Sequence, residues 1–189
     1  MTREIDSLLI DANCLLNLYA TGRLREITIA VPYQFWVADF VVKHEALFVW
    51  RPDPTDGSDV KEPIRLDPLL EEGLIQLMRL EHPAEEETFV GLAAVLDDGE
   101  AITGALAVHR GCSVATDDRK ARRELGQLSP PVRLVSTLEL LKRWGKEAQV
   151  SRDELGAAMA AMQLSASYRP GGRDPLYEWW RSTICRSKC

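Results

Sequence analysis

Several features are scarce in this 189-residue sequence, and each absence argues against a class of protein. No run of 18 or more apolar residues occurs, which argues against a membrane-spanning helix. The N-terminus carries Arg3, Glu4 and Asp6 where a signal peptide would be apolar, so we expect a soluble, cytoplasmic protein with no membrane partner. The 4 cysteines form no C-x-x-C pair near one of the 3 histidines, which argues against a zinc motif and a disulfide framework.

Basic charge is also scarce, because the formal net charge is −6. Tight non-specific binding to nucleic acid usually needs a basic face. The charge is distributed unevenly, however: residues 51–100 hold 14 acidic against 4 basic side chains, whereas residues 101–150 hold 5 against 9. A protein that is acidic overall can therefore still present one basic side.

Strand-like and helix-like segments alternate along the first half of the chain. The apolar run "SLLID" predicts a buried strand, and "CLLNLYATGRL" has helical spacing with Gly22 as a stop. We expect a strand at "ITIAVP", a long apolar helix at "QFWVADFVVKHEALFVW", and a surface loop at 51–63, which is dense in Pro, Asp and Gly.

The second half continues the alternation. Strands are predicted at "GLIQLMRLE", "CSVATD" and "VRLVS", and helices in 84–107 (broken at "DDGE"), at "RKARREL" and at "TLELLKRWG". This order predicts an α/β protein with a three-layer α/β/α architecture around a mostly parallel sheet. We expect one domain at 1–145 and a helical C-terminal extension at 146–189 that packs on the domain or on a partner.

Four acidic residues stand out by position. Asp11 ends the first predicted strand, Glu45 lies within the long apolar helix, Glu100 begins a helix, and Asp117 ends a later strand. Since sites in parallel sheets lie at the carboxyl ends of strands, we expect Asp11 and Asp117 on one edge. Clustered carboxylates repel one another unless a cation offsets their charge, and carboxylate oxygens suit Mg²⁺ or Mn²⁺.

The first two of these acids stand in segments that resemble the PIN-domain nucleases. "LLIDANCLLNL" is similar to the opening strand of that family, with Asp11 as the first metal-site acid and Asn13 as the small polar residue two positions on. "VVKHEAL" resembles the V-x-x-E-L helix of the family, which assigns Glu45 as the second acid.

The other two acids complete the resemblance. "DDGEAITGALA" is similar to a G-E-A-x-A-I-x-L-A motif and assigns Glu100, although many members carry Asp there and Asp97 and Asp98 compete for the role. "VATDDRKAR" resembles a T-D-D-x-x-A-R strand end and assigns Asp117, with Thr116, Asp118 and Asp98 as supporting residues. The four motifs occur in family order between about residues 5 and 145, whereas 51–63 and the tail from 146 have no counterpart.

The resemblance implies a PIN-like fold and a metal-dependent endoribonuclease that hydrolyses RNA phosphodiester bonds. Asp11, Glu45, Glu100 and Asp117 would be both its catalytic and its metal-binding residues, for one or two ions of Mg²⁺ or Mn²⁺. Many small members of the family are the toxins of toxin–antitoxin pairs. A homodimer and an antitoxin-like protein partner are therefore also implied.

Structural alternatives exist for each of these residues. Asp97 and Glu100 also fit a capping box, and Asp11 and Asp118 are each placed to cap the following helix. Glu45 could lie on the wetter edge of its helix. The basic residues of 119–123 are either a solvated helix face or a phosphate-binding patch, and Trp179 and Trp180 either pack the tail or stack on bases.

Functions other than that of a ribonuclease fit parts of the same pattern. A phosphatase of the haloacid dehalogenase type requires a second aspartate where this chain has Asn13. A PIN-like module that binds without cleaving, and a DNA-directed or structure-specific nuclease of the same fold, remain open alternatives.

Overall fold

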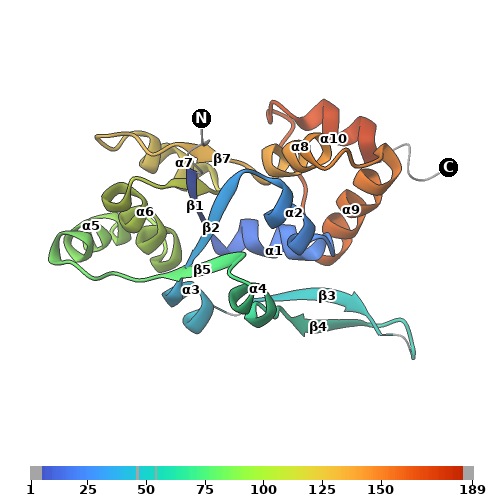
Figure 1. Cartoon of the computed structure of the whole chain (residues 1–189), viewed down its shortest axis with the longest axis horizontal. Helices are drawn as coiled ribbons and strands as arrows, with labels where there is room; N and C mark the ends of the chain where they lie inside the picture. Colours follow the sequence, from blue (N-terminus) through green and yellow to red (C-terminus); the bar gives the residue numbers. More distant parts are fainter. Residues whose placement is uncertain (1–5, 46, 54, 185–189) are drawn as a thin grey trace. The chain divides into compact units, whose positions relative to one another are not determined.

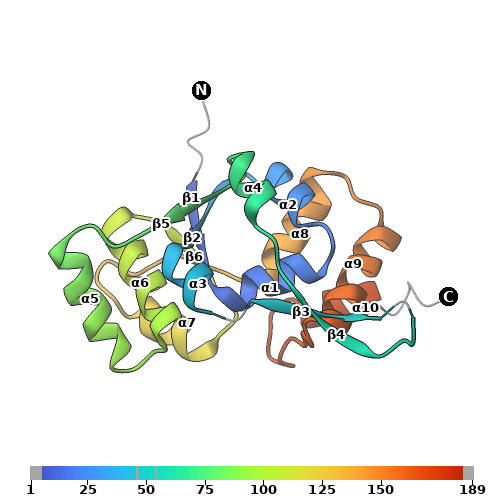
Figure 2. The ribbon, with the colours of Figure 1, turned by 90° about the horizontal axis from the view of Figure 1, so that it is seen from below.

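The computed structural model describes residues 6–45, 47–53 and 55–184 (Figures 1 and 2). The chain divides into two compact units that interleave along the sequence. Unit 1 comprises Met1–Leu15, Pro32–Glu45 and Leu66–Ser136, and unit 2 comprises Leu16–Val31, Ala46–Arg65 and Thr137–Cys189. The sequence-based boundary at 145 stays a prediction.

Unit 1 is built on a five-stranded parallel sheet with the strand order β5-β2-β1-β6-β7. Its strands are β1 (Asp6–Ile10), β2 (Tyr33–Ala38), β5 (Ile75–Met78), β6 (Ser113–Ala115) and β7 (Leu134–Val135). Leu8, Leu9 and Ile10 of the central strand β1 are fully buried, as expected for a parallel strand covered on both faces. The predicted fold class is confirmed: the protein is α/β, with a central parallel sheet flanked by helices.

The helices of unit 1 are α3 (Asp39–His44), α4 (Asp67–Glu71), α5 (Pro83–Ala93), α6 (Asp98–Arg110) and α7 (Arg119–Gly126). Helix α6 packs against β1, β2 and β6, and its small residues Ala101 and Ala105 are fully buried. Helix α5 lies beside α6 in both views (Figures 1 and 2). Helix α6 ends at Gly111, whose φ of 65° is the left-handed conformation that glycine adopts most easily.

Unit 2 is mainly helical. It contains α2 (Leu24–Ala30), α8 (Thr137–Glu147), α9 (Arg152–Ser165), α10 (Tyr177–Ile184) and an antiparallel hairpin of β3 (Phe48–Pro52) and β4 (Asp59–Pro63). Helix α8 packs against α2 and α9, and α9 also packs against α10 and β3. Helix α1 (Ala12–Ala20) runs from the last residues of the first segment of unit 1 into unit 2.

Three sequence-based predictions were wrong. The segment "ITIAVP" forms most of helix α2, because Leu24, Ile27 and Thr28 repeat at helical spacing and are buried. The long helix expected over 34–50 is instead β2, the short helix α3 and the start of β3. The loop expected at 51–63 is largely the hairpin, and only 53–58 connects its strands.

Most other elements agree with the sequence. Helix α1 stops before Gly22, α5 and α6 are separate helices, and the tail after 146 forms α9 and α10. In the described part of the chain, no helix is both long enough and apolar enough to cross a membrane. Cys14 and Cys112 are buried and not disulfide-bonded, while Cys185 and Cys189 lie outside the described residues.

Candidate functional site

Asp11 and Asp117 lie together at the carboxyl edge of the sheet. Strands β1 and β6 are parallel neighbours with Ile10 opposite Ala115, and the backbone N–H of Asp11 donates to the carbonyl oxygen of Ala115 at 3.1 Å. The chain crosses from one side of β1 to the other between β5 and β6, and such a reversal of strand order is where α/β sheets form their sites. The structure therefore places both aspartates where the sequence predicted them.

Cys14 connects the two aspartates. Its backbone N–H donates to Asp11 Oδ1 at 2.7 Å, so Asp11 caps helix α1, and its thiol donates to Asp117 Oδ2 at 3.6 Å. Cys14 is fully buried. Asn13, which precedes it, is exposed. Cys14 is thus a residue that touches both acids, and the supporting role of Asn13 stays a prediction.

The carboxylate of Asp11 is only 4% exposed, and its charge is poorly compensated. Its pKa is raised from 3.8 to about 7, mainly by burial and in smaller part by the negative charge of Asp117. The hydroxyl of Thr116 and the amide and thiol of Cys14 lower the pKa, but by less. Asp11 Oδ2 is buried and accepts no hydrogen bond from the described residues. An unsatisfied buried carboxylate oxygen is costly and requires a cause.

Glu45, Asp97, Glu100 and Asp118 form a second group of electrostatically linked acids. Burial raises the pKa of Glu45, and the charge of Asp97 raises it further. Burial likewise raises the pKa of Glu100, followed by the charges of Asp97 and Asp118, while Lys120 lowers it. Asp118 is adjacent in sequence to Asp117, so the second group continues into the first. All four acids assigned by the resemblance thus belong to unit 1.

Glu45 reaches this group in an unexpected way. It is the residue after helix α3, half-buried, with an extended backbone (φ −94°, ψ 144°), and does not lie on a buried helix face. A β-carbon on Gly99 would overlap Glu45 Oε1. The absence of a side chain at position 99 therefore lets the Glu45 carboxylate approach the first turn of α6.

The two other predicted helix caps are also confirmed. Asp118 Oδ1 accepts from the backbone N–H groups of Lys120 at 2.7 Å and Ala121 at 2.8 Å, at the start of α7. Asp97 Oδ1 accepts from the N–H of Glu100 at 2.8 Å, at the start of α6. Asp98 is exposed. The cap on α6 occupies Asp97 and leaves Glu100 as the half-buried acid of that turn.

Helix α7 also holds the end of β6. Arg122 Nη1 donates to the carbonyl oxygen of Thr116 at 2.9 Å, and Thr116 Oγ1 accepts from the N–H of Asp118 at 3.2 Å. These bonds fix the backbone on both sides of Asp117. Arg122 was predicted only as one of the basic residues of 119–123, on a solvated helix face or a phosphate-binding patch. Roles for Cys14 and Gly99 were not predicted, although Gly99 stands inside a quoted motif and Cys14 stands three residues after a capping aspartate.

The donor set consists mainly of carboxylate oxygens, which Mg²⁺ and Mn²⁺ prefer. Within residues 6–45, 47–53 and 55–184, no three His, Cys, Asp or Glu side chains are already arranged as a metal-binding group. The acids influence one another as two sets: Asp117 acts on Asp11, while Asp97 acts on Glu45 and, with Asp118, on Glu100. A cation bound beside Asp11 and Asp117 would satisfy Asp11 Oδ2, a buried carboxylate oxygen that has no hydrogen-bond partner among the described residues.

Comparison with known proteins gives no relative: no protein-family model, no curated protein and no solved structure matches this chain. The resemblance to the PIN-domain nucleases consequently rests on the four sequence motifs.

Proposed function

We propose that this chain is a metal-dependent endoribonuclease of the PIN-domain type. The observation that carries the proposal is the carboxylate of Asp11, which is buried beside Asp117 at the carboxyl edge of the sheet with one oxygen unsatisfied. A stable protein gains nothing from an uncompensated buried charge. A function that supplies a cation explains it.

Asp11 and Asp117 would hold Mg²⁺ or Mn²⁺, with Glu45 and Glu100 as further ligands or as groups that orient water. A divalent ion bound there lowers the pKa of a coordinated water and offsets charge on phosphoryl oxygens. The protein supplies the positions: the cap on α1 fixes Asp11, and Cys14 and Arg122 fix the segment that carries Asp117. Burial raises the pKa of Glu45 and of Glu100, and the charge of Asp97 raises both further, so a cation bound beside them would relieve this repulsion.

The basic residues after Asp117 support a nucleic-acid substrate. Arg119, Lys120 and Arg123 are exposed on α7, directly after the acids, in a protein whose net charge is negative. Cations beside a hydrolytic site are placed to contact the flanking phosphates. The choice of RNA, a homodimer and an antitoxin-like partner come from the family resemblance and belong to the same proposal.

The test is cleavage of a mixed-sequence RNA oligonucleotide with Mn²⁺ or Mg²⁺ and with EDTA. We expect cleavage that needs the metal and is lost in Asp11→Asn, while the control Asp153→Asn, a change at an exposed aspartate of α9, cleaves normally. A matched DNA oligonucleotide is run in parallel. Cleavage of DNA alone would replace RNA by DNA as the substrate, and binding without cleavage at any metal concentration would leave only a binding module.

A further inference from the structure

In the β3–β4 hairpin of unit 2, one face of strand β3 is attached to the protein, whereas β4 is exposed along its whole length. In its register, Trp50 is opposite Lys61 and Arg51 is opposite Val60. Val49 is fully buried, and Arg51 Nη1 donates to Ser165 Oγ of helix α9 at 3.1 Å while Arg51 Nε pairs with Glu62 Oε2 at 3.6 Å. These contacts hold the hairpin on the side of Val49 and Arg51.

The opposite face carries aromatic side chains and a lysine. Phe48 and Trp50 alternate with Val49 and Arg51, so they share the other face, and their ring centroids are 5.6 Å apart in an edge-to-face arrangement. Lys61 Nζ is 4.2 Å from the centroid of Phe48 and 5.5 Å from that of Trp50. Trp50 is 38% exposed. The outer face of a half-buried antiparallel sheet is normally polar, so this composition is unusual.

We propose that this face, defined by Phe48, Trp50 and Lys61, binds the unpaired bases of single-stranded RNA. An exposed indole offers a flat surface on which a base stacks, and a neighbouring ammonium group pairs with the phosphate of the same strand. Held beside both rings, Lys61 places its charge next to whatever stacks on Trp50. The inference rests on the proposed function only for the identity of the ligand as RNA.

The turn between the strands limits where the RNA lies. It carries Asp53 and Asp56, and Asp59 follows at the start of β4. Asp53 Oδ1 accepts from the N–H of Thr55 at 2.7 Å, and Asp56 Oδ1 accepts from the N–H of Ser58 at 2.8 Å, so both acids are ionised parts of the turn. Their charge repels phosphates. The bound strand therefore occupies the aromatic half of the hairpin and not its tip.

The charge of the same acids provides a way to distinguish RNA from the main alternative ligand of this face, a basic protein segment. Removing the negative charge of Asp56 strengthens the binding of an anionic ligand and weakens the binding of a cationic one. The sign of the change in Kd for Asp56→Asn consequently reports the charge of the occupant.

The experiment measures the affinity of the full chain for a fluorescently labelled single-stranded RNA by anisotropy, in EDTA so that no metal-dependent cleavage occurs. Trp50→Ala should weaken binding by about 5- to 150-fold, the range for the loss of one stacked base, and Trp50→Phe should restore most of it. The matched comparison is Trp179→Ala, because Trp179 of α10 also has a lysine near its ring, with Lys142 Nζ at 5.8 Å, but is less exposed than Trp50, and we expect it to pack the tail and not to stack on bases. It should leave the Kd unchanged. Circular dichroism of each variant verifies the fold.

A second set of variants tests the charge. Lys61→Gln should reduce the dependence of log K on log salt by about 0.7, the value for one phosphate contact on a single strand, whereas exposed Lys146→Gln should not. A perfect duplex should bind more weakly than the single strand, because its bases are already stacked. Asp56→Asn should bind RNA more tightly.

Equal affinity in wild type and Trp50→Ala, or equal loss in Trp50→Ala and Trp179→Ala, would overturn the inference. Weaker RNA binding by Asp56→Asn would also contradict it. This result is independent of catalysis: binding through Trp50 without any metal-dependent cleavage would refute the enzyme and keep the hairpin site. Metal-dependent cleavage with no effect of Trp50 would do the reverse.

Discussion

Two buried carboxylates in unit 1 are equally hidden from solvent and have opposite electrostatics. Asp11 is 4% exposed and Glu85 is 1% exposed. Burial raises the pKa of Asp11 to about 7. Burial also acts to raise the pKa of Glu85, but hydrogen bonds from Arg110 and from the N–H groups of Glu81 and His82 lower it to about 2. The difference lies in the partners that the chain itself provides.

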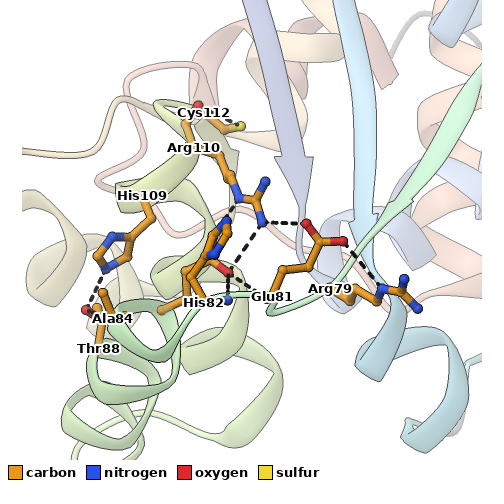
Figure 3. Close-up of polar contacts among 9 residues, drawn as sticks. Arg79, Glu81, His82, Ala84, Thr88, His109, Arg110 and Cys112 are labelled. Atoms are coloured by element: carbon orange, nitrogen blue, oxygen red, sulfur yellow. Dashed lines mark hydrogen bonds and ion pairs between the residues drawn. The ribbon is translucent and has the colours of Figure 1, made fainter.

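Around Glu85 those partners are complete. Arg110 Nε donates to Glu85 Oε1 at 2.6 Å, the N–H of Glu81 donates to Oε2 at 2.7 Å, and that of His82 donates to Oε2 at 3.1 Å. Arg110 also pairs with Glu81, which pairs with Arg79 (Figure 3). This network stabilises the start of α5, whereas one oxygen of Asp11 has no donor in the part of the chain that the structure describes. The fold thus provides a full set of hydrogen-bond donors for the buried carboxylate of Glu85, but not for that of Asp11 at the candidate site.

The largest expected effect on stability comes from breaking the satisfied group. Glu85→Gln should lower the free energy of unfolding at pH 7 by about 2 to 3 kcal/mol, less than for a fully buried ion pair because Arg110 is 30% exposed. Because the folded state lowers the pKa of Glu85, its contribution is present above pH 4.5 and is lost as the pH falls towards 2. Urea unfolding from pH 7 to pH 2 measures both effects. Glu81→Gln, at an exposed partner of the same arginine, is the control and should change stability little.

The same measurement should give the opposite sign at Asp11. In metal-free protein at pH 8, Asp11→Asn should raise the free energy of unfolding by about 2 kcal/mol. A rise of the pKa from 3.8 to about 7 corresponds to a gain of at most about 4 kcal/mol on removing the charge. The expected gain is smaller because the new amide N–H₂ would be buried without an acceptor. Between pH 4 and pH 7 the folded wild type binds the proton that the unfolded chain releases, so its stability falls as the pH rises. Asp11→Asn should lack this slope, and a destabilised, equally pH-dependent variant would contradict the account.

The adjacent residues Asp117 and Asp118 should have different roles, Asp117 as a metal ligand and Asp118 as the cap of helix α7. Asp118→Ala should lower the free energy of unfolding by about 0.5 to 2 kcal/mol, because two backbone N–H groups of α7 lose their acceptor, and should keep RNA cleavage at saturating Mn²⁺. Asp117→Asn should abolish cleavage with little loss of stability. Urea unfolding and cleavage are measured on both variants. If the two lose activity equally and Asp118→Ala is as stable as wild type, the division of roles is mistaken.

The smallest structural change is at Gly99. Gly99→Ala should displace the Glu45 carboxylate, because the new β-carbon would overlap Glu45 Oε1, and should reduce cleavage several-fold with the fold intact. Gly91→Ala in α5, where a β-carbon meets open space, is the control and should stabilise the protein by about 0.5 to 1 kcal/mol. Unchanged cleavage by Gly99→Ala would remove Glu45 from the site.

The sequence predicted the carboxyl edge of the sheet better than the segments between its strands. Asp11, Asp97 and Asp118 were placed correctly because a capping acid before an amphipathic run is a local signal. The strand β2 was missed because its residues are apolar at nearly every position, so the period of two in its burial was not visible beforehand. Helix α2 was missed because β-branched Ile27, Thr28 and Ile29 favour a strand, and packing of one helical face overrode that preference.

Contacts between distant segments of the chain could not be predicted from the sequence. The approach of Glu45 to Gly99 depends on the packing of α3 against α6, and the bond from Cys14 to Asp117 joins residues 103 positions apart. The hairpin was mistaken for a loop because its turn residues outnumber the apolar ones, and only the cross-strand register shows that Trp50 and Lys61 face each other. Local signals thus located the acids, and tertiary packing decided their neighbours.

The most direct test of the central claim is calorimetric titration of Mn²⁺ into wild type and Asp11→Asn at pH 6 and pH 8.5, each in two buffers of different ionisation enthalpy. If the unsatisfied carboxylate of Asp11 is a metal ligand with a pKa of about 7, wild type should bind Mn²⁺ at both pH values and bind it more weakly at pH 6. At pH 6 it should release about one proton more per ion than at pH 8.5, because Asp11 must lose its proton to bind. Asp11→Asn should bind far more weakly and lack this release. No Mn²⁺ binding by wild type, or equal affinity and equal proton release in the two proteins, would contradict the account.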